Sequence, residues 1–169
     1  MATSHSIRTA TVDDIPLIRE LCFNVWPQTY AGIISAEQIE YMLELMYSPA
    51  SLRKQMEDGA TFLIINDGEE AVGFASFQEI KSAVYKLHKL YVLPSQQGKG
   101  TGRHLVEYIC NEISAKGANA LQLQVNKNNK AKQFYNKLGF IIVEELKLDI
   151  GNGYYMDDYI MELKLEKGS

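Results

Sequence analysis

The sequence predicts an α/β fold, built on a mixed, mostly antiparallel sheet with flanking helices. Segments with apolar residues at helical spacing alternate with segments in which every second residue is apolar, as expected for helices packed on a sheet. Asn66-Asp67-Gly68 lies between two apolar runs and is a hairpin signal. Later, a strand is followed by a glycine turn and a helix, which favours a parallel pair of strands in the same sheet.

The first half of the chain carries helix caps and short strands. Thr11 is a helix cap, Ser35 with Gln38 forms a capping box, and Ser48-Pro49 opens a short third helix. The apolar face of the first helix consists of Ile15, Ile18, Cys22 and Val25. Strands are expected at residues 7–9, 61–65, 72–77 and 84–93. The last three are consecutive and are expected to pair antiparallel.

The second half alternates helices and strands. A helix extends from Gly102 to Lys116-Gly117, and a second helix around 131–138 is closed by Gly139. Strands are expected at residues 121–125, 140–148 and 154–165. No repeat or linker divides the sequence, so residues 1–169 are expected to form a single domain.

Composition narrows the class of protein. The formal net charge is −4 at pH 7, so no nucleic-acid partner is expected. The N-terminus lacks the apolar core of a signal peptide and no apolar run reaches membrane-spanning length, which predicts a cytoplasmic protein without a membrane partner. Cys22 and Cys110 lack Cys-x-x-Cys spacing, so neither a disulfide nor a metal site is expected.

The turn Gln97-Gly98-Lys99-Gly100-Thr101-Gly102 is the most informative stretch of the chain. Helix N-termini carry free N–H groups and partial positive charge, and glycines let an anion approach them. The turn fits neither the dinucleotide spacing G-x-G-x-x-G nor the nucleotide P-loop. The nearby basic residues favour a small anionic cofactor over a polyanionic polymer. They are Lys99, Arg103, Lys127, Lys130, Lys132 and Lys137.

Two segments together resemble the GNAT (GCN5-related) N-acetyltransferase superfamily. Gln97-x-x-Gly100-x-Gly102 matches its acetyl-CoA motif, and the segment 125–140 matches V-N-x-x-N-x-x-A-x-x-F-Y-x-K-x-G-F almost position by position. The resemblance extends over roughly residues 6 to 165 and is strongest over 86 to 143. It implies a GNAT-like sheet with a splayed parallel strand pair, and acetyl-CoA as the cosubstrate.

The resemblance also implies which residues bind acetyl-CoA. The backbone of Leu90-Tyr91-Val92 would pair with the pantetheine arm, as an extended ligand suits an unpaired strand edge. Asn126 matches a position that contacts the cofactor amide, whereas Asn129 could either cap a helix or bond the cofactor. The implied cofactor-binding residues are Leu90, Tyr91, Val92, Gln97, Gly98, Lys99, Gly100, Thr101, Gly102, Arg103, Asn126, Asn129, Lys132, Tyr135 and Lys137.

Acetyl transfer to an amine requires a neutral amine, a stabilised oxyanion and a proton for the leaving thiolate. Tyr135 matches the family tyrosine assigned as general acid, and a phenol with a pKa of about 10 stays protonated at neutral pH. The alternative is a core tyrosine on the apolar stripe of its helix. Many relatives have a glutamate as base where this chain has His88, while Tyr85, Glu79 and a water chain are the alternatives.

The acceptor is expected to be a small polyamine. In this fold the acceptor wall comes from the first two helices and the final hairpin, and here these carry aromatic and acidic residues that could hold a cationic amine. They are Trp26, Tyr30, Glu37, Glu40, Tyr41, Glu44, Tyr154, Tyr155, Asp157 and Asp158. The glutamates also lie opposite an apolar stripe, as on a solvated helix face.

The segments 26–30 and 157–162 resemble bacterial spermine/spermidine-type acetyltransferases. Two alternatives remain at this point: an acetyltransferase of protein N-termini of the ribosomal-protein type, and a non-catalytic acetyl-CoA-binding module. A homodimer is a further candidate assembly. Retention of Tyr135 favours an enzyme, because a binding module does not need this side chain.

Overall fold

The computed structural model describes residues 5–30 and 32–165, apart from the side chains of residues 25 and 27–29. Val25 and the segment 27–29, both noted in the sequence, therefore lie outside the described side chains. The chain folds into two compact units, which are described separately. The first comprises Met1–Gln78 and Lys89–Tyr108, and the second comprises Glu79–His88 and Ile109–Ser169.

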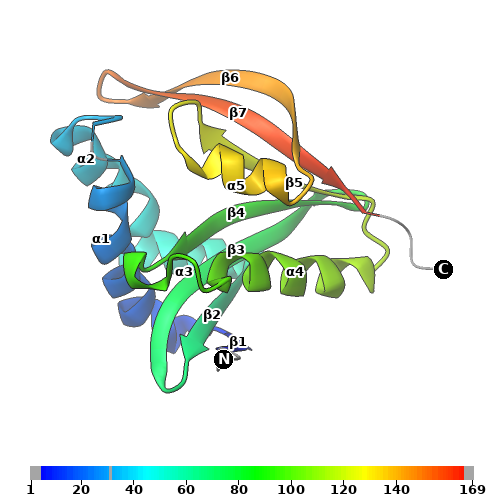
Figure 1. Cartoon of the computed structure of the whole chain (residues 1–169). Coiled ribbons are helices and arrows are strands. Elements are labelled where there is room, and N and C mark those ends of the chain that lie inside the picture. The colour runs from blue at the N-terminus through cyan, green and yellow to red at the C-terminus, as the bar shows by residue number, and fades with distance from the viewer. Residues whose placement is uncertain (1–4, 31, 166–169) are drawn as a thin grey trace. The chain divides into compact units, whose positions relative to one another are not determined.

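The first unit begins with a strand and four helical segments (Figure 1). These are β1 (His5–Thr9), the 3-10 turn η1 (Val12–Asp14), α1 (Ile15–Tyr30), α2 (Ala36–Tyr47) and α3 (Pro49–Glu57). Thr11 caps η1 rather than α1, so a short 3-10 turn leads into the first helix. Ser35 and Ser48 cap α2 and α3, as predicted, by accepting the backbone N–H groups of Gln38 and Ser51.

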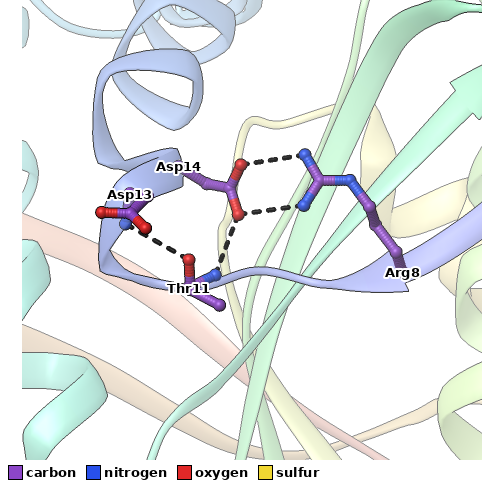
Figure 2. A network of polar contacts seen from close by, with 4 residues as sticks. All are labelled: Arg8, Thr11, Asp13 and Asp14. Carbon is purple, nitrogen blue, oxygen red and sulfur yellow. Dashed lines mark hydrogen bonds and ion pairs between the residues drawn. The ribbon is translucent and has the colours of Figure 1, made fainter.

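The entry into α1 is fixed by a small polar network (Figure 2). Thr11 Oγ1 accepts the Asp13 N–H at 3.3 Å, and Asp14 Oδ2 accepts the Thr11 N–H at 2.9 Å in the capping-box arrangement. The two terminal nitrogens of the Arg8 guanidinium, Nη1 and Nη2, donate to the Asp14 carboxylate at 2.9 Å. These bonds lower the pKa of Asp14, with the Arg8 bond as the largest cause and the Thr11 N–H as the next.

Antiparallel pairing joins the strands of the first unit. β2 (Thr61–Asp67) pairs with β1 and with β3 (Glu70–Lys81). The four residues from Phe62 to Ile65 are all buried, as expected for a strand covered on both faces. Asp67 lies opposite Glu70, so the hairpin turn falls at Gly68-Glu69, slightly later than the sequence predicted. Gly68 has φ +65°, which glycine adopts without strain.

The second unit contains the parallel pair. Val84–Leu87 of β4 (Val84–Val92) pairs in parallel with Ala120–Leu123 of β5 (Ala120–Asn126). β5 then pairs antiparallel with β7 (Tyr154–Lys164), which pairs with β6 (Ile141–Gly151). The strand order β1-β2-β3-β4-β5-β7-β6 confirms the mixed sheet, while the splay of β4 from β5 stays a prediction.

Helices complete the second unit, and several elements are shared. α4 (Thr101–Ser114) and α5 (Ala131–Lys137) are the helices expected after the glycine turn and after β5. β3, β4 and α4 each begin in one unit and end in the other. The single domain stays a prediction.

Over the residues described, no helix is both long and apolar enough to cross a membrane.

Candidate active site

The glycine turn lies between the 3-10 turn η2 (Pro94–Gln96) and α4 in the first unit. α4 begins at Thr101, one residue earlier than predicted, and the N–H of His104 bonds to the Gly100 carbonyl at 2.9 Å. The first three helical N–H groups have no carbonyl one turn earlier to bond. Gly98 and Gly100 have φ +81° and +74°, and a Cβ on either would meet no heavy atom within 4 Å. The turn therefore presents open backbone that fits an anion.

Lys99 in the turn and Arg103 directly after it form ion pairs at the surface. Lys99 Nζ lies 3.8 Å from Asp67 Oδ2, and Arg103 Nε donates to Glu107 Oε1 at 2.8 Å. Exposed pairs of this kind contribute about 0–1 kcal/mol. A phosphate group can therefore compete for either side chain at little cost.

The strand before the turn is packed closely against β3. A Cβ on Gly73 would lie 2.8 Å from the Tyr91 carbonyl oxygen and 3.3 Å from Val92 Cα. The Leu93 N–H donates to the Val72 carbonyl at 2.9 Å in the same region. Gly73 therefore permits the close approach of β3 to the backbone proposed to bind pantetheine. The sequence analysis did not single it out, although a glycine inside a strand signals such an approach.

An aromatic cluster surrounds Tyr91 in the first unit. The ring centroids of Trp26 and Phe74 lie 5.9 and 5.6 Å from that of Tyr91, and Tyr47 lies 5.7 Å from Trp26. Burial raises the pKa of Tyr47 and of Tyr91 well above the ordinary value. Trp26 is 2% exposed, so this residue, expected in the acceptor wall, packs in the core of the unit.

The loop between β5 and α5 uses two of the predicted residues. Asn126 Oδ1 accepts the Asn128 N–H at 2.8 Å, and Asn129 Oδ1 accepts the Ala131 N–H at 2.9 Å. Asn129 thus bonds the first N–H of α5, although the cap position of this helix is Lys130, which makes no side-chain cap bond. The side-chain oxygens of Asn126 and Asn129 already accept bonds within the loop. Contact of either residue with the cofactor stays a prediction.

Tyr135 lies in α5 and is 7% exposed. Its ring centroid is 5.2 Å from that of Phe134 and 5.6 Å from that of Phe140. The packing expected of a core tyrosine is therefore present, and its role as acid stays a prediction. Of the nearby basic residues, Lys132 has its Nζ 5.0 Å from the Tyr159 ring, while Lys137 is exposed in the last turn of α5.

The three candidate bases differ in their surroundings. His88 is exposed in β4 and shares a strand face with Lys86. Tyr85 is 8% exposed on the opposite face, and its pKa is raised by burial and then by the charge of Glu79. Glu79 itself accepts the backbone N–H of Ala83 at 3.2 Å.

A partly buried row of polar side chains crosses three strands of the second unit. Lys86 Nζ donates to Gln124 Oε1 at 3.4 Å, and Gln124 Nε2 donates to Asp158 Oδ2 at 2.7 Å. Burial raises the pKa of Asp158 and lowers that of Lys86. The sequence analysis missed Lys86 and Gln124, although Gln122, Gln124 and Asn126 alternate with apolar residues along β5.

The remaining acidic residues of the expected acceptor wall are exposed. Glu37, Glu40 and Glu44 lie on α2 away from its buried stripe, which includes Ile39 and Met42. Asp157 forms an ion pair with Lys127, whose Nζ lies 3.3 Å from Asp157 Oδ1. The glutamates therefore occupy the solvated face that their spacing predicted.

Comparison with known protein families identifies the family. The model of the acetyltransferase (GNAT) domain matches residues 30–154. The chain belongs to the GNAT acetyltransferase family. As a member, it is an N-acetyltransferase that uses acetyl-CoA as cosubstrate, which confirms the resemblance seen in the motifs.

Relatives of this GNAT acetyltransferase cover most of its length. It is 30% identical over 169 residues to a spermidine N(1)-acetyltransferase of Thermoplasma acidophilum, covering 96% of this chain and 99% of that protein. It is 28% identical over 119 residues to a ribosomal protein bS18-alanine N-acetyltransferase of Haemophilus influenzae, covering 70% of this chain and 77% of the relative.

Solved structures show the same fold. The PaiA N-acetyltransferase of Thermoplasma acidophilum, solved in complex with coenzyme A, has a TM-score of 0.80 at 28% identity and covers 95% of this chain and 99% of its own. A GCN5-related N-acetyltransferase of Rhodopseudomonas palustris has a TM-score of 0.82 at 24% identity, with 98% of both chains covered.

Proposed function

We propose that this GNAT acetyltransferase transfers the acetyl group of acetyl-CoA to a primary amine of a small polyamine. The observation that carries the proposal is the similarity to the spermidine N(1)-acetyltransferase, which extends over 96% of this chain. The similarity to the bS18-alanine acetyltransferase extends over 70% of it. The longer match takes in almost the whole chain, and so also the N-terminal helices and the final hairpin, where this fold is expected to bind the acceptor.

The charge on α2 agrees with a polycationic acceptor. Glu37, Glu40 and Glu44 are exposed together on one helix face, and a row of like charges draws an oppositely charged ligand from solution. A polyamine retains positive charge on the nitrogens that do not react. A peptide N-terminus carries its charge on the reacting nitrogen itself, so it would gain less from this face.

The proposal assigns roles to the start of α4, the strand before the glycine turn, His88 and Tyr135. The N–H groups at the start of α4 bind the pyrophosphate, and the backbone of residues 90–92 pairs with the pantetheine amides. His88 accepts a proton from the attacking amine, whose nitrogen forms a bond to the acetyl carbon. As the carbon–sulfur bond breaks, Tyr135 donates its proton to the leaving thiolate.

A panel of acceptors tests the proposal. Thiol release would be followed with spermidine, spermine, an uncharged-tail monoamine of similar length, and a peptide that begins with alanine. Spermidine or spermine is expected to give the highest kcat/KM, by at least about tenfold over the monoamine. A preference for the peptide would favour the N-terminal acetyltransferase alternative. Binding of acetyl-CoA without thiol release from any acceptor would favour a non-catalytic module.

A further inference from the structure

A line of side-chain hydrogen bonds lies beside the glycine turn, and all its members belong to the first unit. It joins His5 in β1, Thr101 at the start of α4, Gln96 in η2 and Asp67 at the end of β2. Thr101 is 1% exposed and Gln96 is 5% exposed. Polar groups buried to this extent are costly unless each donor finds an acceptor.

The atoms fix the direction of each bond. The Thr101 hydroxyl donates to Gln96 Oε1 at 2.8 Å, which uses the one hydrogen that this hydroxyl carries. His5 Nε2 lies 3.0 Å from Thr101 Oγ1 and 3.4 Å from Gln96 Oε1, and the tautomer that satisfies both oxygens carries a hydrogen on Nε2, which then donates. Gln96 Nε2 then donates to Asp67 Oδ2 at 3.3 Å. The bonds therefore run one way, from His5 to Asp67.

These bonds hold both ends of the turn. Gln96 directly precedes residues 97–100 and Thr101 directly follows them. The Lys99 N–H donates to the Gln96 carbonyl at 3.1 Å, and Lys99 Nζ lies 3.8 Å from Asp67 Oδ2. Two of the residues between the ends are glycines at positive φ with open space around them. A turn of this composition has high conformational freedom, so its anchored ends decide where its N–H groups point.

We propose that His5 is a positioning residue for the acetyl-CoA site. Its Nε2–H group orients Thr101 and Gln96, and these hold the turn in the conformation that binds the pyrophosphate. A preorganised turn binds an anion without first losing the freedom of its backbone. The inference rests on the function proposed for the turn. His5 lies 96 residues before Thr101 and outside both sequence motifs.

Calorimetric titration with coenzyme A tests the proposal, using variants that differ in one donor group. The side-chain amide nitrogen of glutamine lies about as far from the backbone as Nε2 of histidine does. The amide nitrogen of asparagine lies only about as far out as Nδ1 of histidine. His5→Asn and Thr101→Val are expected to weaken coenzyme A binding by about three- to tenfold, the effect of losing one buried hydrogen bond. His5→Gln is expected to restore binding to within about twofold. His104→Asn is the matched control, since it changes an exposed neighbouring histidine outside these bonds.

A ligand without the pyrophosphate separates positioning of the turn from general stability. The affinity for pantetheine is expected to be the same in wild type and His5→Asn, because pantetheine does not use the turn. Parallel losses for both ligands, or unchanged coenzyme A binding in His5→Asn and Thr101→Val, would overturn the proposal. A wild type that binds coenzyme A but acetylates no amine would contradict the proposed function and leave this result standing.

A spectroscopic measurement on the wild type gives a second, independent test. Nitrogen-15 correlation spectra of the His5 ring should show a hydrogen on Nε2 at neutral pH. A ring with its hydrogen on Nδ1 alone would leave Thr101 Oγ1 without a donor and overturn the proposal. The absence of this hydrogen would overturn the proposal whether or not His5→Asn folds.

Discussion

Asp157 and Asp158 are consecutive residues of β7 whose carboxylates have opposite environments. Asp157 is exposed and lies 3.3 Å from Lys127 Nζ, while Asp158 is 1% exposed and accepts a bond of 2.7 Å from Gln124. Successive side chains of a strand point to opposite faces of the sheet, which explains the difference. The second oxygen of Asp158, Oδ1, has no hydrogen-bond partner. The two residues therefore make a matched pair for mutation.

We expect Asp158→Asn to stabilise the protein increasingly as the pH rises. Burial raises the pKa of Asp158 above its usual 3.8, so the folded state holds this proton to higher pH than the unfolded state does. The folded wild type therefore loses stability as the pH rises from about 4 through the raised pKa. Urea unfolding of variant and wild type at pH 4 and pH 7 measures the difference.

The gain from Asp158→Asn should be larger at pH 7 than at pH 4, and a gain that shrinks with pH would contradict the assigned burial cost. Asp157→Asn is the control. It removes an exposed ion pair, which contributes about 0–1 kcal/mol, so it should change the free energy of unfolding by no more than that.

Gly73→Ala should weaken the use of acetyl-CoA as well as the fold. The added Cβ would lie 2.8 Å from the Tyr91 carbonyl oxygen, so β4 must shift. Overpacking of this kind costs about 1–3 kcal/mol. Because the displaced backbone is the proposed partner of pantetheine, the KM for acetyl-CoA is expected to rise about tenfold.

Gly117→Ala separates the two effects of Gly73→Ala. Gly117 has φ +85° and no heavy atom near its Cβ position, so alanine there strains the backbone without touching the proposed site. It should lower the melting temperature and leave the KM for acetyl-CoA unchanged. An equal rise of the KM for acetyl-CoA in both variants would mean that lost stability alone causes the rise in Gly73→Ala.

Tyr135→Phe should act on the chemical step. Removal of a general acid costs about 10²- to 10⁴-fold in rate, so kcat is expected to fall in that range while coenzyme A affinity stays within a few-fold. Steady-state kinetics with calorimetry of coenzyme A binding measure both. A preserved kcat with a lowered melting temperature would make Tyr135 a packing residue, as its contacts with Phe134 and Phe140 already allow.

Asp14→Ala should destabilise the protein at neutral pH and have little effect in strong acid. The variant removes the capping box and the bond to Arg8 (Figure 2), at a cost of about 1 kcal/mol. The bonds lower the pKa of Asp14 below its usual 3.8. Their contribution is therefore complete above that value and is lost as the pH falls through the lowered pKa. The free energy of unfolding of wild type and variant would be measured at pH 7 and pH 3. The difference between the two proteins should be smaller at pH 3.

The sequence predicted features whose causes are local. Ser35, Ser48 and Gly68 act on backbone within a few residues, so the caps and the hairpin could be placed from spacing alone. The glycine turn and the segment 125–140 likewise carry their motif within a short stretch. Boundaries were less predictable, because β3 and β6 extend further than their apolar runs and are held by partner strands.

The features that the sequence did not predict join distant residues. His5 contacts Gln96 across 91 positions, and Lys86 contacts Gln124 across 38. Nothing in the neighbouring sequence marks these polar side chains, because only the fold brings them together away from full solvent contact. Gly73 is similar, since its lack of a side chain matters only because Tyr91 lies against it.

The outer strand β6 has a consequence for how one copy of the protein meets another. Ile141, Ile142 and Val143 are 57%, 50% and 47% exposed on this edge, and the register with β7 shifts at Val143 and again near Ile150. Between the two shifts lie three carboxylates, Glu144, Glu145 and Asp149, against one lysine. A second copy that paired with this edge could form only a short run of regular backbone hydrogen bonds. The negative charges of the two β6 strands would also repel each other. The same strand therefore combines an apolar end with two features that oppose edge-to-edge pairing: the carboxylates and the interrupted ladder.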